Sequence, residues 1–302
     1  MTQDPISDKR RILVHRIMSG TLIASLLILA ANHMPAIGGW LLLVAICALA
    51  QLEFYRLLNL PGIPVFRWVG VCVGAAMVTA TYFTMGMSAE KMSAALTWEH
   101  FILYGGMILV FLRQFPQRDN TQPLATVACT LLGILYVPYL FNFFTRLLYT
   151  WEYGPQDARV GDTGRQLIFY LVLVVKSTDV GAFFVGSAIG KHKLFPRLSP
   201  RKTWEGFFGG LAFALIASLT FIHTTRGNFG VLHVRLLDGV ILGVMLSLVG
   251  TAGDMFESLL KRASGSKDSG AVVPGMGGLL DVLDSLLFGA PVLYFYARFI
   301  LT

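Results

Sequence analysis

Residues 250–285 read GTAGDMFESLLKRASGSKDSGAVVPGMGGLLDVLDS and are flanked by apolar segments on both sides. Two apolar helices are therefore expected, joined by a linker in which Pro274 and several glycines interrupt helical structure. The spacing i, i+3, i+4 and i+7 places polar side chains on one face of the first helix, and i, i+3 and i+4 does so on the second. These side chains are Asp254, Glu257, Ser258 and Lys261, followed by Asp281, Asp284 and Ser285.

The composition is that of a membrane protein. Of 302 residues, 55% are hydrophobic and 14% are charged, and apolar runs of about 20 residues recur along the chain. This predicts an all-α, polytopic integral membrane protein. The net charge of +7 is explained by basic residues at helix ends and lipid headgroups, so no nucleic-acid partner is expected. Cys47, Cys72 and Cys129 show no paired spacing, which argues against a disulfide or a cysteine metal site.

Hydropathy predicts about nine membrane spans, of which the short second and fourth are the weakest. The chain divides into amino-terminal helices at residues 1–150 and a carboxy-terminal catalytic region at 166–302, with loops at 190–204 and 261–278. The expected spans are 17–31, 37–51, 66–85, 99–112, 124–144, 166–189, 205–223, 236–260 and 279–301.

The distribution of basic residues orients these spans. If the amino terminus is inside, most of the 24 Lys and Arg fall in cytoplasmic segments, as the positive-inside rule requires. Both basic loops are then cytoplasmic and Thr302 is outside, which suits a bacterial inner membrane. Glu53 falls at the cytoplasmic end of the second span and is expected to be a solvated end residue.

Charged side chains in the last spans need an explanation, because each costs about 2.5–3.5 kcal/mol or more at the centre of a membrane helix. Lys176 and Asp179 are three residues apart and are expected to pair for structural reasons. The four carboxylates described above have too few basic partners in the same spans, and clustered carboxylates repel one another unless a cation joins them. Mg²⁺ is the expected cation, since it takes oxygen ligands from carboxylates and from substrate phosphates.

A second polar segment precedes the seventh predicted span. Ser199, Arg201, Lys202 and Thr203 lie next to one another there. Arg and Lys with adjacent hydroxyl groups are typical of phosphate sites, so a lipid phosphate or a triphosphate is expected at this segment.

Several short motifs occur in order along the carboxy-terminal part of the chain. S-x-x-K-R-x4-K-D-x-G starts at Ser258, P-G-x-G-G at Pro274 and D-x-x-D at Asp281, while SPRKTWEG and D-x-G-A precede them at 199–206 and 179–182. In this combination the chain resembles the phosphatidate cytidylyltransferases, integral membrane enzymes that make CDP-diacylglycerol. Their signature has His where this chain has Met276 and Arg where it has Val282. The amino-terminal half matches the family in hydropathy only.

The resemblance implies that CTP and phosphatidate react in the bilayer to give CDP-diacylglycerol and pyrophosphate, for phospholipid biosynthesis. Asp254 and Asp281 are then expected to be the main Mg²⁺ ligands, supported by Asp284 and Glu257. A catalytic role is also expected of Lys261 and Arg262. Substrate binding is expected at Ser199, Arg201, Lys202, Thr203, Ser258, Lys267 and Asp268, where Asp268 would orient its loop or take a metal. The oligomeric state is open, a homodimer included.

Three alternatives remain at this stage. A cation-coupled transporter would explain acidic residues within the membrane, but not the K-R-x4-K-D motif beside them. A cytidylyltransferase acting on another lipid phosphate has the same polar residues, because acyl-chain contacts are unspecific. A non-catalytic membrane scaffold leaves the acidic residues unexplained.

Overall fold

The computed structural model describes residues 36–58, 63–85, 89–115, 120–151, 162–196, 198–265 and 278–302. The first predicted span, at 17–31, and the motif residues Lys267 and Asp268 lie outside these ranges. The helices are α2 (Ala36–Leu57), α3 (Arg67–Met85), α4 (Ala89–Gln114), α5 (Pro123–Ile134), α6 (Leu140–Tyr149), α7 (Asp162–Ile189), α8 (Trp204–Thr224), α9 (Leu236–Ala263) and α10 (Leu279–Tyr296). Two π-helical segments, η1 (Leu135–Tyr139) and η2 (Ala297–Leu301), continue α5 and α10, and the short strands are β1 (Lys193–Phe195), β2 (Ser199–Thr203), β3 (Asn228–Phe229) and β4 (Leu232–His233).

The all-α membrane architecture is confirmed. Six spans in the described part of the chain are long and apolar enough to cross a membrane: α2, α5 with η1 and α6, α7, α8, α9, and α10 with η2. The predicted number of about nine spans is not confirmed. The second and fourth predicted spans belong to helices of 22 and 26 residues, longer than hydropathy indicated. Helix α2 continues past its apolar run because Gln51 and Glu53 are buried against protein and do not face lipid.

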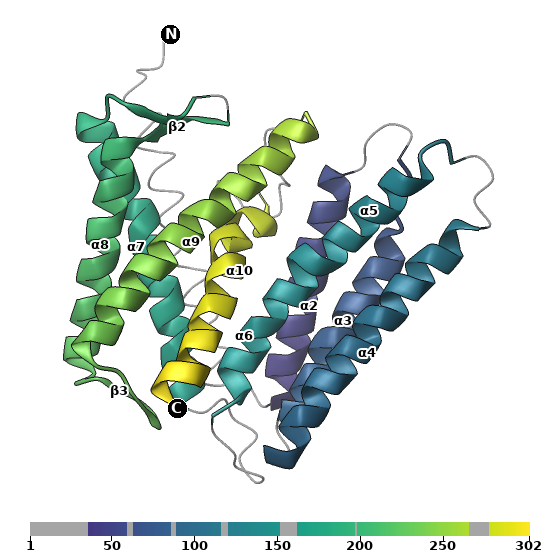
Figure 1. The fold of residues 1–302 in the computed structure, drawn as a ribbon, viewed down its shortest axis with the longest axis horizontal. Coiled ribbons are helices and arrows are strands. Elements are labelled where there is room, and N and C mark those ends of the chain that lie inside the picture. The colour runs from purple at the N-terminus through teal and green to yellow at the C-terminus, as the bar shows by residue number, and fades with distance from the viewer. Residues whose placement is uncertain are drawn as a thin grey trace.

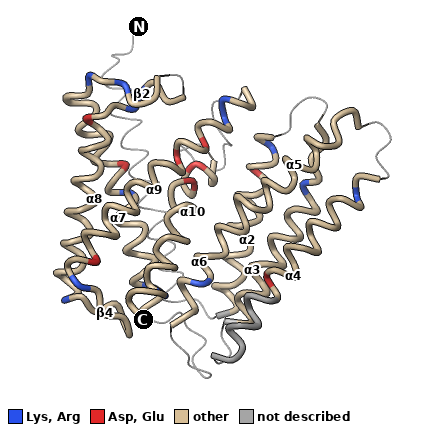
Figure 2. Tube along the Cα trace, viewed as in Figure 1, with Lys and Arg blue, Asp and Glu red and all other residues tan. Residues whose placement is uncertain are grey.

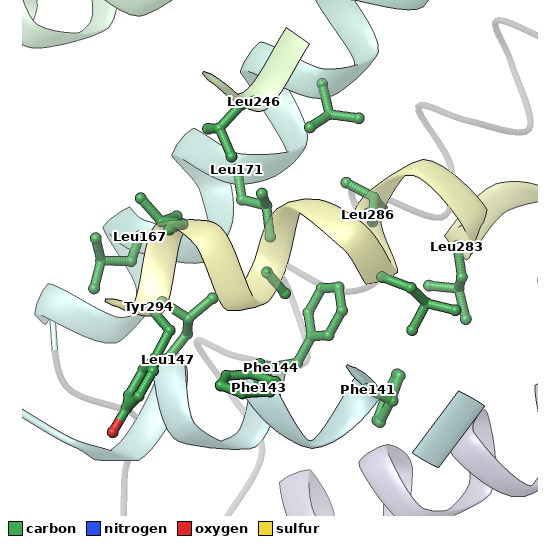
Figure 3. Packing of buried hydrophobic residues seen from close by; sticks show 14 of the residues in the cluster. Phe141, Phe143, Phe144, Leu147, Leu167, Leu171, Leu246, Leu283, Leu286 and Tyr294 are labelled. Atoms are coloured by element: carbon green, nitrogen blue, oxygen red, sulfur yellow. The ribbon is translucent and has the colours of Figure 1, made fainter. Parts of the chain in front are cut away.

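Helix α10 lies in the middle of the bundle. Figure 1 shows α7, α8 and α9 on one side of it and α2 to α6 on the other. Buried residues make up 61% of the α10 span, against 33% to 44% in the other five spans. Leu283, Leu286 and Tyr294 of α10 pack with Phe143 of α6 and Leu171 of α7 (Figure 3). Lipid tails are as apolar as leucine, so close packing holds these helices together more than exclusion from the solvent does.

Small residues bring α7 and α8 into backbone contact. A Cβ atom at Gly206 would lie 2.8 Å from the Ala182 carbonyl oxygen. The antiparallel strands β1 and β2 pair Lys193 with Thr203 and cover the adjoining ends of these helices (Figure 1). The Glu205 carboxylate accepts hydrogen bonds from the backbone N–H of Lys191 at 3.1 Å and of His192 at 3.2 Å. The hairpin is thus tied to the start of α8, which fixes the position of β2.

Candidate active site

Helices α9 and α10 cross at Gly253. A Cβ atom at this position would lie 2.6 Å from the Asp284 carbonyl oxygen and 3.1 Å from the Ser285 Cα atom. Both neighbours are backbone atoms, which cannot rotate away as a side chain can. Gly253 therefore lets the two helices approach closely enough for Asp254 on α9 to lie beside Asp284 on α10.

We expect Gly253→Ala to lower the turnover of the expected cytidylyl transfer by at least about tenfold, or ~1.4 kcal/mol in the barrier, because α10 must move away from α9. Gly250→Ala, one turn earlier, is the matched control, since its nearest contact is a Val175 side-chain atom at 3.3 Å. Turnover and thermal unfolding of both variants in detergent check this. Equal activity in the two variants would contradict the role given to the Gly253 crossing.

Three carboxylates meet at this crossing, and we call Asp254, Glu257 and Asp284 the acidic cluster. One carboxylate oxygen from each lies within 4.8 Å of the other two. Glu257 and Asp284 are 2% and 4% exposed, whereas the Asp254 side chain is 35% exposed. The Glu257 Oε1 atom is buried and has no hydrogen-bond partner among the described residues. The cluster is thus buried on one side and accessible at Asp254.

Lysines from two directions pair with these acidic groups. Lys261 Nζ lies 3.1 Å from Glu257 Oε2 and 2.6 Å from Asp281 Oδ1, so it joins α9 to α10. Lys202 of β2 forms an ion pair with Asp254. Figure 2 shows the Asp and Glu residues of α10 and of the carboxy-terminal half of α9 toward the end of the bundle that carries β2, whereas Asp238 lies in the first turn of α9. Two lysines thus pair with three of the four carboxylates: Lys261 belongs to the last turn of α9, and Lys202 comes from a segment distant in the sequence.

Asp281 is placed differently from the three clustered carboxylates. Its Oδ2 atom accepts a hydrogen bond from the Gly278 N–H at 2.9 Å, which caps the start of α10. Its Oδ1 atom faces Lys261. The structure thus brings Asp254 together with Asp284 and Glu257 more directly than with Asp281. The role of Asp281 as a main metal ligand stays a prediction from the sequence.

Lys176 lies at the same site, although the sequence predicted for it only a structural pair with Asp179. The expected ion pair with Asp179 is present at 3.4 Å. The Lys176 Nζ atom also donates to the Val282 carbonyl oxygen at 3.1 Å and to Ser285 Oγ at 3.3 Å. The three-residue spacing from Asp179 was enough to explain a lysine within a span, and nothing in the sequence indicated its contact with α10.

The prediction for Glu53 is wrong. This side chain is 2% exposed, and its Oε2 atom accepts a hydrogen bond from the Leu280 N–H at 2.8 Å. The carboxylate therefore stabilises the positive amino-terminal end of α10 from the amino-terminal half of the chain. The feature of the sequence that could have indicated this buried contact is the position of an ionisable residue within an apolar run.

The remaining phosphate-binding candidates are spread around the same end of the bundle. Thr203 is buried, and its hydroxyl group accepts from the Gly206 N–H at 3.2 Å, which caps α8. Ser199 and Arg201 lie with it on β2, and Arg201 is exposed. Helix α9 extends to Ala263, so Ser258 and Arg262 are helical and the loop predicted from 261 starts later. Lys202 is the member of this set that reaches the acidic cluster through an ion pair.

Comparison with known proteins extends the similarity beyond the motifs. Residues 9–300 match the sequence profile of the family described as the cytidylyltransferase family. A phosphatidate cytidylyltransferase of Bacillus subtilis is 33% identical over 254 residues, which are 83% of this chain and 84% of that protein. One of Staphylococcus haemolyticus is 32% identical over 273 residues, or 90% and 96% of the two chains. One of Haemophilus influenzae is 42% identical over 139 residues, or 46% and 48%. The longer matches include the amino-terminal half.

Proposed function

Because this chain belongs to the cytidylyltransferase family, we propose that it transfers the cytidylyl group of CTP to phosphatidate, giving CDP-diacylglycerol and pyrophosphate. The observation that carries this proposal is the meeting of the acidic cluster with Lys202 and Lys261 at one end of the bundle. Carboxylates for a cation and lysines for phosphate groups are the two components that a nucleotidyl transfer needs.

The acidic cluster fits Mg²⁺. Its three groups offer only oxygen atoms, and a hard cation that keeps some water prefers such a donor set. The buried Glu257 Oε1 atom without a partner is a further sign that the donor set is incomplete without a cation. Bound at Asp254, Glu257 and Asp284, Mg²⁺ would supply positive charge for the triphosphate and for the departing pyrophosphate.

The protein side chains then have separate tasks. A phosphatidate oxygen attacks the α-phosphorus of CTP, a new P–O bond forms, and the bond to the β-phosphate oxygen breaks. Phosphatidate is already an anion near neutral pH, so a general base is not essential. The main obstacle is repulsion between two anions, which Lys202 and Lys261 lower by pairing with phosphate oxygens. Arg262 and Lys267 are proposed to assist at the triphosphate, and Ser199, Arg201 and Thr203 near the lipid phosphate.

The direct test uses purified protein in detergent with labelled CTP, Mg²⁺ and a set of lipid phosphates. We expect equal amounts of CDP-diacylglycerol and pyrophosphate from phosphatidate, and much less product from a polyprenyl phosphate or an archaeal ether lipid phosphate. Replacing CTP by dATP tests the choice of base. Product from another lipid only would change the substrate, and the absence of any nucleotidyl transfer would overturn the proposal.

We also propose that the end of the bundle with the acidic cluster faces the cytoplasm of a bacterial inner membrane. In a variant without Cys47, Cys72 and Cys129, a thiol introduced by Ser266→Cys should react only from inside. Val231 is 66% exposed in the turn between β3 and β4, at the opposite end of the bundle (Figure 1), and Val231→Cys should react only from outside. Labelling with a membrane-impermeant reagent checks both, and the reverse pattern would contradict the orientation.

A further inference from the structure

Tyr136 lies at an interruption in the helix of the span 123–149. The π-helical segment η1 contains Pro138, and the side chains of Tyr136, Val137 and Pro138 are all buried. Proline lacks the backbone N–H of a regular helical turn, and single π-helical turns within α-helices are frequent at functional sites. No motif pointed to this segment, which belongs to the amino-terminal half.

The Tyr136 ring packs against α9 and α10, the two helices that carry the acidic cluster. Its centroid lies 5.0 Å from that of Phe256 on α9 and 6.1 Å from that of Phe288 on α10. Phe256 directly precedes Glu257, and Phe288 follows Asp284 by one helical turn. The ring is therefore held between the two helices that supply the carboxylates.

The Tyr136 hydroxyl group is a buried donor without a partner. The residue is 4% exposed, and its hydroxyl oxygen makes no hydrogen bond to any residue that the structure describes. Asp284, Glu257, Asp254 and Asp281 all act on this group electrostatically. Leaving a hydroxyl group buried and unpaired is unfavourable, so a partner is expected in the state that binds ligand.

We infer that Tyr136 is a positioning residue for the cation site, whose hydroxyl group donates a hydrogen bond to the carboxylates of the acidic cluster when a divalent cation is bound. The inference rests on the proposed function, because it takes the acidic cluster as that site. Of the two Glu257 carboxylate oxygens, Lys261 pairs with Oε2, and Oε1 has no hydrogen-bond partner among the described residues, so Oε1 can accept a hydrogen bond. A donor that orients metal-binding carboxylates typically accounts for 10- to 100-fold in metal affinity.

The test is Mn²⁺ binding to the full-length protein in detergent without nucleotide, followed by electron paramagnetic resonance. We expect Tyr136→Phe to weaken Mn²⁺ binding by about 10- to 100-fold. The ring and its packing remain in this variant. In the presence of EDTA its unfolding temperature should equal or exceed that of the wild type, because an unpaired buried hydroxyl group has been removed.

Tyr170→Phe is the matched control. Tyr170 is also fully buried, but its hydroxyl group has a hydrogen-bond partner, Ser218 Oγ, at 2.6 Å. This variant should unfold at a lower temperature and bind Mn²⁺ with unchanged affinity.

The outcomes separate the inference from the proposed function. If the wild type bound no Mn²⁺, or if Asp284→Asn bound it equally well, the cation site itself would be wrong. If Asp284→Asn lost binding while Tyr136→Phe kept wild-type affinity, the site would stand and the role of Tyr136 would be overturned. A lower unfolding temperature of Tyr136→Phe with unchanged affinity would likewise make the hydroxyl group structural.

Discussion

Asp284→Asn is expected to reduce CTP turnover by at least about a hundredfold, the scale of losing one strong electrostatic contact in a catalytic site. Asp284 is 4% exposed and belongs to the acidic cluster with Asp254 and Glu257. Removing its charge leaves the proposed cation with less negative charge to hold it in a region of low dielectric. Asp254→Asn should have an effect of similar size. The double variant should be little worse than either single one, because residues that act as a unit are not additive.

The controls for this prediction separate catalysis from folding. Asp284→Asn should stay folded, since Asn has nearly the same size and relieves repulsion between acids. Asp238 is also a buried carboxylate, but it lies in the first turn of α9, at the other end of that helix from the acidic cluster. It accepts hydrogen bonds from the Arg235 N–H and from the Tyr296 hydroxyl group. Asp238→Asn should lower the unfolding temperature and leave the Mg²⁺ dependence of turnover unchanged. Full activity of Asp284→Asn, or losses that multiply in the double variant, would contradict a shared cation site.

The sequence predicted the parts of the site that depend on local spacing. The i, i+3, i+4 and i+7 pattern correctly placed Glu257 and Lys261 on one face of α9, where they form an ion pair. Hydropathy correctly predicted the all-α membrane class, because a span of apolar residues is a property of the local sequence, whereas the number of about nine spans is not confirmed. The order of the motifs pointed to the family that the comparisons show.

Contacts between distant segments could not be predicted in this way. Glu53 binds the start of α10 across 227 residues of sequence, and its local surroundings resemble a helix end near water. The proximity of Asp254 to Asp284 depends on how closely α9 and α10 cross at Gly253. Spacing alone places Asp281 and Asp284 on the same face of α10, and it does not predict that Asp281 pairs with Lys261 while Asp284 joins the acidic cluster.

Lys261→Met is the second substitution for which we expect a large effect. The Lys261 side chain is 18% exposed and is bonded to both Glu257 and Asp281. Its removal leaves a buried carboxylate without its partner, a change that typically costs about 3–5 kcal/mol in stability. It also removes one of the cations proposed to hold the triphosphate, so turnover should fall by about a hundredfold or more. Thermal unfolding and CTP turnover, measured on the same preparations, check the two effects.

The double variant Lys261→Met with Glu257→Gln tests the structural role of Lys261. Neutralising Glu257 removes the unpaired buried charge, so the unfolding temperature should recover, while turnover should stay low because the phosphate contact and one ligand of the proposed cation are both missing. Arg56→Met is the control for a general loss of positive charge, since Arg56 is exposed in the last turn of α2 and should leave turnover within about twofold, or ~0.4 kcal/mol. Recovery of turnover together with stability would contradict both the phosphate contact of Lys261 and the role of Glu257 in the proposed cation site. The phosphates would then have to be held by Lys202, Arg262 and Lys267.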